Sequence, residues 1–88
     1  MATSKYTIAK LNADNYFNWR YKMQMLLTEK GVWATINKDT PDQVTTEWTA
    51  SDEKAHATIA LNVEDSQIQH IRNCDSARSA WNALKEFH

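Results

Sequence analysis

The scarcity of glycine and proline is the feature that most restricts the folds open to this chain. Its 88 residues contain one of each, Gly31 and Pro41. Tight turns and β-hairpins use both residue types heavily, because glycine accepts a positive φ and proline presets the turn backbone. We therefore expect an all-α fold of about four to five helices in a small orthogonal or bundle-like packing, with a short extended N-terminal arm.

The length allows one domain, residues 1–88, with one hydrophobic core. We expect residues 1–12 to form the extended arm and residues 13–88 to form the helical part. Within the arm, Tyr6 begins a short alternating segment in which Ile8 and Leu11 can dock on the core. The segment is too short to form a stable strand by itself.

Capping residues and apolar spacing divide the rest of the chain into helices. The first is expected from Asp14 or Asn15 to Lys30, where Gly31 ends it. The further expected elements are a short helical piece at 32–36, a long loop at 37–46, a second long helix at about 49–63, a short helix containing Ile68 and Ile71, and a final helix capped by Asp75 or Ser76.

Large apolar side chains recur at spacings of three and four in these helices, which marks the face that packs inward. The four tryptophans lie on such stripes or at helix starts, so we interpret them as core residues rather than as a stacking surface for sugars or peptides. The expected core anchors are Leu11, Tyr16, Trp19, Met23, Leu27, Trp33, Trp48, Ile59, Ile68, Trp81 and Leu84, and Phe87 is also expected to face inward.

The first helix carries apolar side chains on two faces. Besides the core-facing stripe it has a second row, Phe17, Tyr21 and Met25, centred well away from the first. In one interpretation the helix is central and buried on both sides. In the other, the second row is exposed in the monomer and forms a contact between subunits, so these three residues are the candidate assembly surface.

Candidate metal ligands are few. His70 and Cys74 are four residues apart and could project from one helical face. A structural zinc site needs four ligands, usually in closely spaced pairs, and neither His56 nor His88 supplies a second pair. We expect a surface histidine, a half-buried cysteine, and no metal or cofactor site.

Catalysis is not expected either. Nucleophile elbows, oxyanion loops and phosphate-binding loops need glycines that this chain lacks. The acidic pairs Asp52-Glu53 and Glu64-Asp65 are better explained as residues that complement the dipole in the first turns of helices. We therefore expect no catalytic residue, no enzyme activity and no small-molecule substrate.

The net charge of −1 argues against a dedicated nucleic-acid binder, because phosphate neutralisation supplies most of the affinity of such proteins. The cations Lys10, Arg20, Lys22 and Lys30 are scattered around the first helix instead of lying on one face. The chain has no apolar run for a transmembrane helix and no signal-peptide pattern. Cys74 is the single cysteine, so we expect an intracellular protein without a disulfide or a membrane partner.

The anchors follow one another in an order that spans residues 6–87. The ordered positions are Leu11-Asn12-Ala13-Asp14-Asn15-Tyr16, then Trp19, Met23, Leu26-Leu27, Trp33, Trp48, Ala55, Ile59, Ile68, Ile71, Ala77, Trp81 and Leu84. This order resembles the N-terminal capsid region of the Gag polyprotein of copia-type LTR retrotransposons. In that family a K-L-x-G-x-N-Y-x-x-W start leads into a long helix and a later tryptophan. Ala13 stands where the family often has glycine.

The resemblance implies a small helical capsid domain that self-associates into a virus-like particle around the element's RNA, in the cytoplasm. Its partners would be further copies of itself. RNA would be bound only indirectly, through later capsid helices and a zinc knuckle that the family's Gag has after the region ending here at His88. Two other function classes stay open: a domesticated Gag-derived adaptor for a host protein, and a nucleic-acid-binding module.

Overall fold

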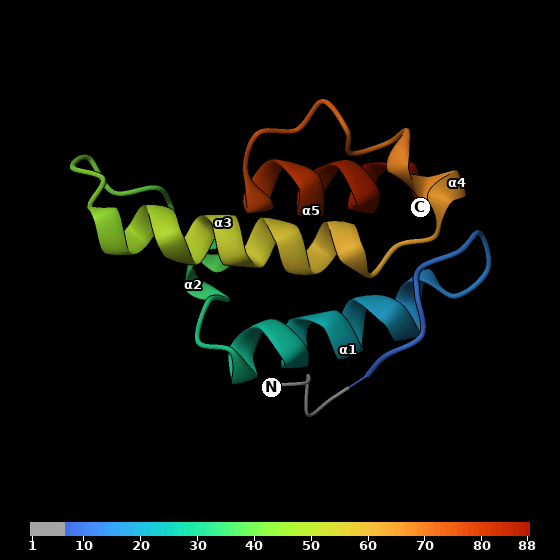
Figure 1. Cartoon of the computed structure of the whole chain (residues 1–88). Helices are drawn as coiled ribbons and strands as arrows, with labels where there is room; N and C mark the ends of the chain where they lie inside the picture. The colour runs from blue at the N-terminus through green and yellow to red at the C-terminus, as the bar shows by residue number, and fades with distance from the viewer. Residues whose placement is uncertain (1–6) are drawn as a thin grey trace.

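The computed structural model describes residues 7–88 as a set of helices (Figure 1). The five helices are α1 (Tyr16–Glu29), α2 (Ala34–Asn37), α3 (Thr46–Leu61), α4 (Asp65–Ile68) and α5 (Ala77–Phe87). Over the described range there is no strand, only an isolated bridge. The predicted all-α class and the predicted number of helices are therefore confirmed. Tyr6 and the rest of the first six residues of the expected arm lie outside the described residues.

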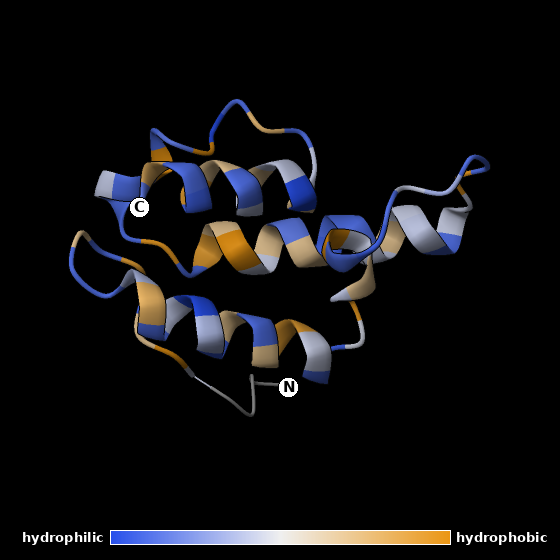
Figure 2. Cartoon of the chain, turned by 180° about the vertical axis from the view of Figure 1, so that it is seen from behind, coloured by the Kyte–Doolittle hydropathy of each residue, from blue (hydrophilic) through white to orange (hydrophobic). Residues whose placement is uncertain are grey.

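The three long helices are arranged around α3. In Figure 1, α5 lies on one side of α3 and α1 on the other, and apolar residues occur along all three (Figure 2). The direction of α1 is opposite to that of α3, so the start of α1 lies near the end of α5. Over residues 7–88, every helix is too short or too polar to cross a bilayer.

The segment before α1 is fixed by backbone pairing with the linker after α3. The Leu11 N–H donates to the Asn62 carbonyl and the Glu64 N–H donates to the Leu11 carbonyl, both at 2.9 Å. The Leu11 side chain is fully buried. The residue that precedes α1 is Asn15, whose side-chain amide donates to the Lys10 carbonyl at 2.9 Å and thus holds the turn.

Three indole rings from three parts of the chain pack together in the core, the buried Trp19 and Trp81 and the half-buried Trp33. The Trp19 and Trp81 rings stack with centroids 6.2 Å apart, and the Trp33 ring meets Trp81 edge-on at 5.1 Å. The Trp19 Nε1–H donates to the Asn62 carbonyl at 2.8 Å, so this buried donor is satisfied. The described residues hold no buried side-chain nitrogen or oxygen without a hydrogen-bond partner.

Most of the expected core anchors lie in the interior, with some exceptions. The buried ones are Leu11, Tyr16, Trp19, Met23, Leu27, Ile59, Trp81 and Leu84. Trp33 and Ile68 are half-buried and pack against the core. Phe87 is 58% exposed, so its expected inward position is wrong.

The expected role of Trp48 as a core anchor is wrong, because this residue is half-buried and lies outside the core cluster. Helix α3 begins at Thr46, three residues earlier than predicted, where the Thr45 hydroxyl caps it by accepting from the Trp48 N–H at 3.0 Å. Trp48 does share the helical face of the buried Ala55 and Ile59. However, the first turns of α3 extend beyond the start of α5 (Figure 1), so this part of the stripe lies outside the reach of α5.

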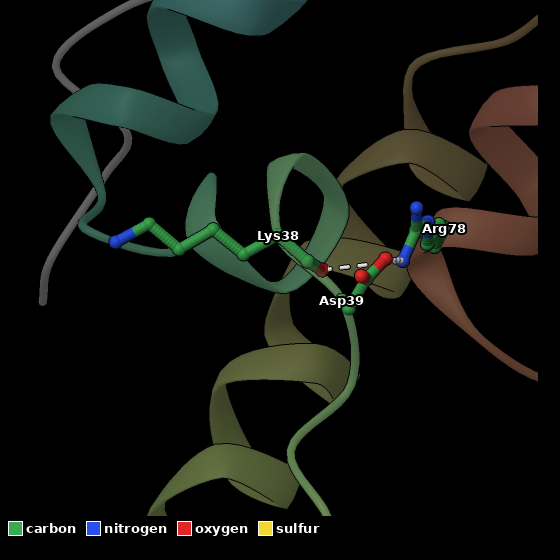
Figure 3. A network of polar contacts seen from close by, with 3 residues as sticks. All are labelled: Lys38, Asp39 and Arg78. Carbon is green, nitrogen blue, oxygen red and sulfur yellow. Dashed lines mark hydrogen bonds and ion pairs between the residues drawn. The ribbon is translucent and has the colours of Figure 1, made fainter.

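Two polar contacts position the start of α5. The buried Asp52 carboxylate accepts a hydrogen bond from the Ala77 N–H at 3.1 Å, so it caps α5 instead of complementing its own helix as we had expected. Arg78 pairs with Asp39 at 3.0 Å and donates to the Lys38 carbonyl at 3.3 Å (Figure 3). This ion pair is exposed and contributes at most about 1 kcal/mol.

Trp19→Ala should destabilise the protein far more than Trp48→Ala. The first removes a buried ring from the indole group and costs about 3–5 kcal/mol, a large part of the stability of a small domain. The second removes a half-exposed ring and costs about 1–2 kcal/mol. Urea unfolding followed by circular dichroism measures both, and equal losses would contradict the burial seen here.

Asp52→Ala should lower the free energy of unfolding by about 1–2 kcal/mol, because it leaves a buried N–H of α5 without its acceptor. The neighbouring Glu53 is exposed, so Glu53→Ala is the matched control and should change stability by less than about 0.5 kcal/mol. If the two variants unfold at the same urea concentration, Asp52 does not act as a cap.

Candidate interaction surface

The most unusual surface feature is the row of Phe17, Tyr21 and Met25 on α1, which we call the α1 row. These side chains are 78%, 67% and 43% exposed. They lie four residues apart, on the side of α1 opposite to its buried stripe. Of the two interpretations of the second row, the structure therefore excludes a helix buried on both sides.

Exposure of these three side chains has an energetic meaning. Single exposed apolar residues are normal on protein surfaces, but a row on one helical face is a contiguous apolar patch. Burying such a row against another surface would release about 25 cal/mol for each Å² removed from water. The α1 row can therefore provide the apolar centre of a protein–protein contact.

Cations flank the α1 row. Arg20 and Lys22 are both exposed, and a helical projection places them at opposite borders of the row. Glu29, the last residue of α1, is its only acid. In the described part of the chain, Arg78 forms an ion pair with Asp39, whereas Arg20 and Lys22 form no ion pair. Both charges are thus free to meet an acidic surface.

A series of ring contacts connects the α1 row to the end of α5. Phe17 meets the Tyr16 ring edge-on at 5.6 Å, and Tyr16 stacks on His88 at 4.8 Å with the rings nearly parallel. Phe87 in turn lies against the His70 ring, with centroids 3.5 Å apart. The start of α1 and the end of α5 therefore share one partly exposed aromatic surface.

Polar interactions also fix this aromatic surface. The His88 Nε2–H donates to the Gln67 Oε1 at 2.9 Å. Burial, and secondly the charge of His70, lower the pKa of His88 below its ordinary value of 6.5. Burial raises the pKa of Tyr16, an effect that the Arg20 charge partly opposes. Both rings are therefore uncharged at neutral pH.

The residues considered as metal ligands do not converge. Within residues 7–88, no three His, Cys, Asp or Glu side chains lie close enough together to hold a metal ion. His70 packs on Phe87, and the half-buried Cys74 packs against the core. The geometry gives no arrangement through which these groups could act together.

Two shallow hollows lie along α3. The first is about 300 Å³ and is lined by Val44, Thr45, Thr46, Thr49, Ala50 and Glu53. The second is about 320 Å³, lies between α1 and α3, and is lined by Thr7, Leu26, Lys30, Lys54, Ala57, Thr58, Leu61 and Asn62. We refer to the first as the acidic hollow, after Glu53, and to the second as the basic hollow, after Lys30 and Lys54.

Sequence reasoning identified the α1 row but missed the aromatic surface at the end of α5. Gln67 and His70 lie in one turn that is far in the sequence from both Tyr16 and His88, and no spacing rule links these segments. The acidic hollow was missed for a similar reason, since it forms where the loop before α3 meets the outer side of that helix. The one sequence signal for it is that Thr46, Ala50 and Glu53, which are small or polar, recur at helical spacing on one face of α3.

Comparison with known proteins gives two matches. Residues 23–88 match the family described as the gag-polypeptide of LTR copia-type. The whole chain is 34% identical, over 92 aligned positions, to the retrovirus-related Pol polyprotein from transposon TNT 1-94 of Nicotiana tabacum. The chain spans 7% of the length of that polyprotein. No solved structure matches the chain.

The lowered pKa of His88 predicts a loss of stability on mild acidification. Below pH 6.5 the unfolded chain binds a proton at this ring before the folded protein does, so the free energy of unfolding falls as the pH drops. Thermal unfolding between about pH 7.5 and 5.5 should show a decreasing midpoint, and His88→Gln should flatten this dependence. The effect is small because the ring is only half-buried. An unchanged pH dependence in His88→Gln would contradict it.

Proposed function

Because this chain belongs to the gag-polypeptide family of LTR copia-type elements, we propose that it is a capsid domain whose copies self-associate into a virus-like particle. Membership of the family supports a capsid-type Gag role, which is structural and not catalytic. The finer proposal is that the particle forms in the cytoplasm and encloses the RNA of the element. RNA contact is indirect in this proposal and depends on Gag sequence that follows this region.

The observation that carries the proposal is the α1 row. A capsid subunit must present an apolar surface to its neighbours while its own core stays closed. Helix α1 meets both needs, since Trp19 and Met23 are buried while Phe17 and Tyr21 on the other side are exposed. The size of the row suits a weak contact, because stable dimers usually bury about 800 Å² on each partner.

Weak individual contacts are compatible with a shell. When many copies are held in one assembly, each further contact forms at high effective concentration, so the whole can be stable although each pair is weak. The isolated domain should therefore associate measurably only when it is concentrated. Self-association should therefore be measured at high protein concentration.

Tyr21→Asp combined with Met25→Asp should abolish self-association and leave the monomer folded. Both side chains are exposed, so charging them should cost less than about 1 kcal/mol of folding stability. Burying the two carboxylates in an apolar contact would be costly. Sedimentation equilibrium of the concentrated domain measures association, and circular dichroism measures helix content.

Leu61→Asp is the matched control, because Leu61 is 73% exposed but lies on α3, away from the α1 row. It should associate like the unchanged protein. In the complete Gag protein, electron microscopy should show particles for the control and none for the α1 variant. A folded α1 variant that still forms particles would overturn the role of the row, and an unchanged protein that never associates would overturn the proposed function.

A further inference from the structure

We propose that self-association is head-to-tail: the α1 row of one copy docks into the acidic hollow of the next. This inference rests on the proposed function and names the surface that receives the row. It commits to a second copy of this chain as the occupant. The two surfaces lie on different helices, so each copy can use both at once.

Charge complementarity is the first argument. Residues 39–53 contain five acids and no lysine or arginine. Two of the acids are already engaged within the fold, Asp39 with Arg78 and Asp52 with α5. Of the other three, Glu53 lines the acidic hollow, and Asp42 and Glu47 are exposed and lie within two residues of lining residues in the sequence. The two cations at the borders of the α1 row, Arg20 and Lys22, are opposite in sign to these acids.

Shape and polarity support the same pairing. The α1 row consists of large side chains that project into solvent, whereas the hollow is lined mainly by threonine and alanine. Val44, at the side of the hollow, is 52% exposed and offers an apolar contact of its own. An aromatic ring placed against Val44 and Ala50 in this hollow would bury apolar surface on both copies.

The charges also argue against the other places where the row could dock. The basic hollow carries Lys30 and Lys54 and no acid in its lining, so it would repel Arg20 and Lys22. A symmetric contact of one α1 row with another would place Tyr21 opposite its own copy. The cations on either side of Tyr21 would then face the same cations of the second subunit.

The positions of the two surfaces make the contact repeat. Helix α1 begins at the end of the molecule where α3 finishes, whereas the acidic hollow is at the start of α3, at the opposite end (Figure 1). A contact between different surfaces on two copies leaves one of each surface free. It can therefore continue into a ring or an open chain, which a symmetric pair cannot do.

A mixing experiment tests this geometry. One variant, Tyr21→Asp with Met25→Asp, lacks the row, and the other, Ala50→Arg with Glu53→Lys, lacks the acidic hollow. The matched control is Ala57→Arg, which makes the same change on the same outward side of α3 seven residues later, in the basic hollow. Val44→Arg, which lies outside the helices, blocks the hollow without altering α3.

In sedimentation equilibrium of the full chain, each hollow variant should bind itself at least about tenfold more weakly than the unchanged protein, whereas Ala57→Arg should match it. The row and hollow variants mixed in equal amounts should form a one-to-one heterodimer and nothing larger, because one intact row meets one intact hollow. Circular dichroism confirms that each variant is folded.

Three results would overturn the inference. If the unchanged protein associates but the mixture stays monomeric, the contact is not head-to-tail, and the proposed function survives. The same conclusion follows if both hollow variants associate like the unchanged protein. If the unchanged protein does not associate at any concentration tested, the proposed function fails together with this inference.

Discussion

The stacking of Trp19 on Trp81, with Trp33 at its edge, is the interaction on which the rest of the structure depends. It joins α1 and the residue before α2 to α5, which comes after the whole of α3 in the sequence. Residues 7–88 form one core cluster, so no second cluster there compensates for its loss. The indole N–H of Trp19 also bonds to the Asn62 carbonyl, so the same ring fixes the linker after α3.

Closing this small core has a consequence for the surface. Only one side of α1 can face α3 and α5, so its second apolar row is left outside. The first turns of α3 likewise extend past the start of α5 and leave the acidic hollow uncovered. The features we associate with self-association therefore result directly from a core too small to cover its own long helices.

The proposed subunit needs no pocket for chemistry. In the described residues the polar groups inside the fold serve to position helices. Asp52 is the clearest case, since a carboxylate that could have been a catalytic candidate caps α5. Among the exposed charges, Arg20 and Lys22 on α1 and Glu53 in the acidic hollow lie on separate surfaces and are opposite in sign, as the proposed association between copies requires.

The sequence by itself determined the helical class, the number of helices, most of the core and the two-sided character of α1. These properties follow from local spacing, capping residues and the near absence of glycine and proline, which act within a few residues of one another. The tertiary structure decided which stripe positions are covered. Trp48 lies on the correct face but has no helix opposite it, and Phe87 turns toward His70 instead of the core. Neither outcome could be read from the spacing, because burial depends on where the partner helices end in space.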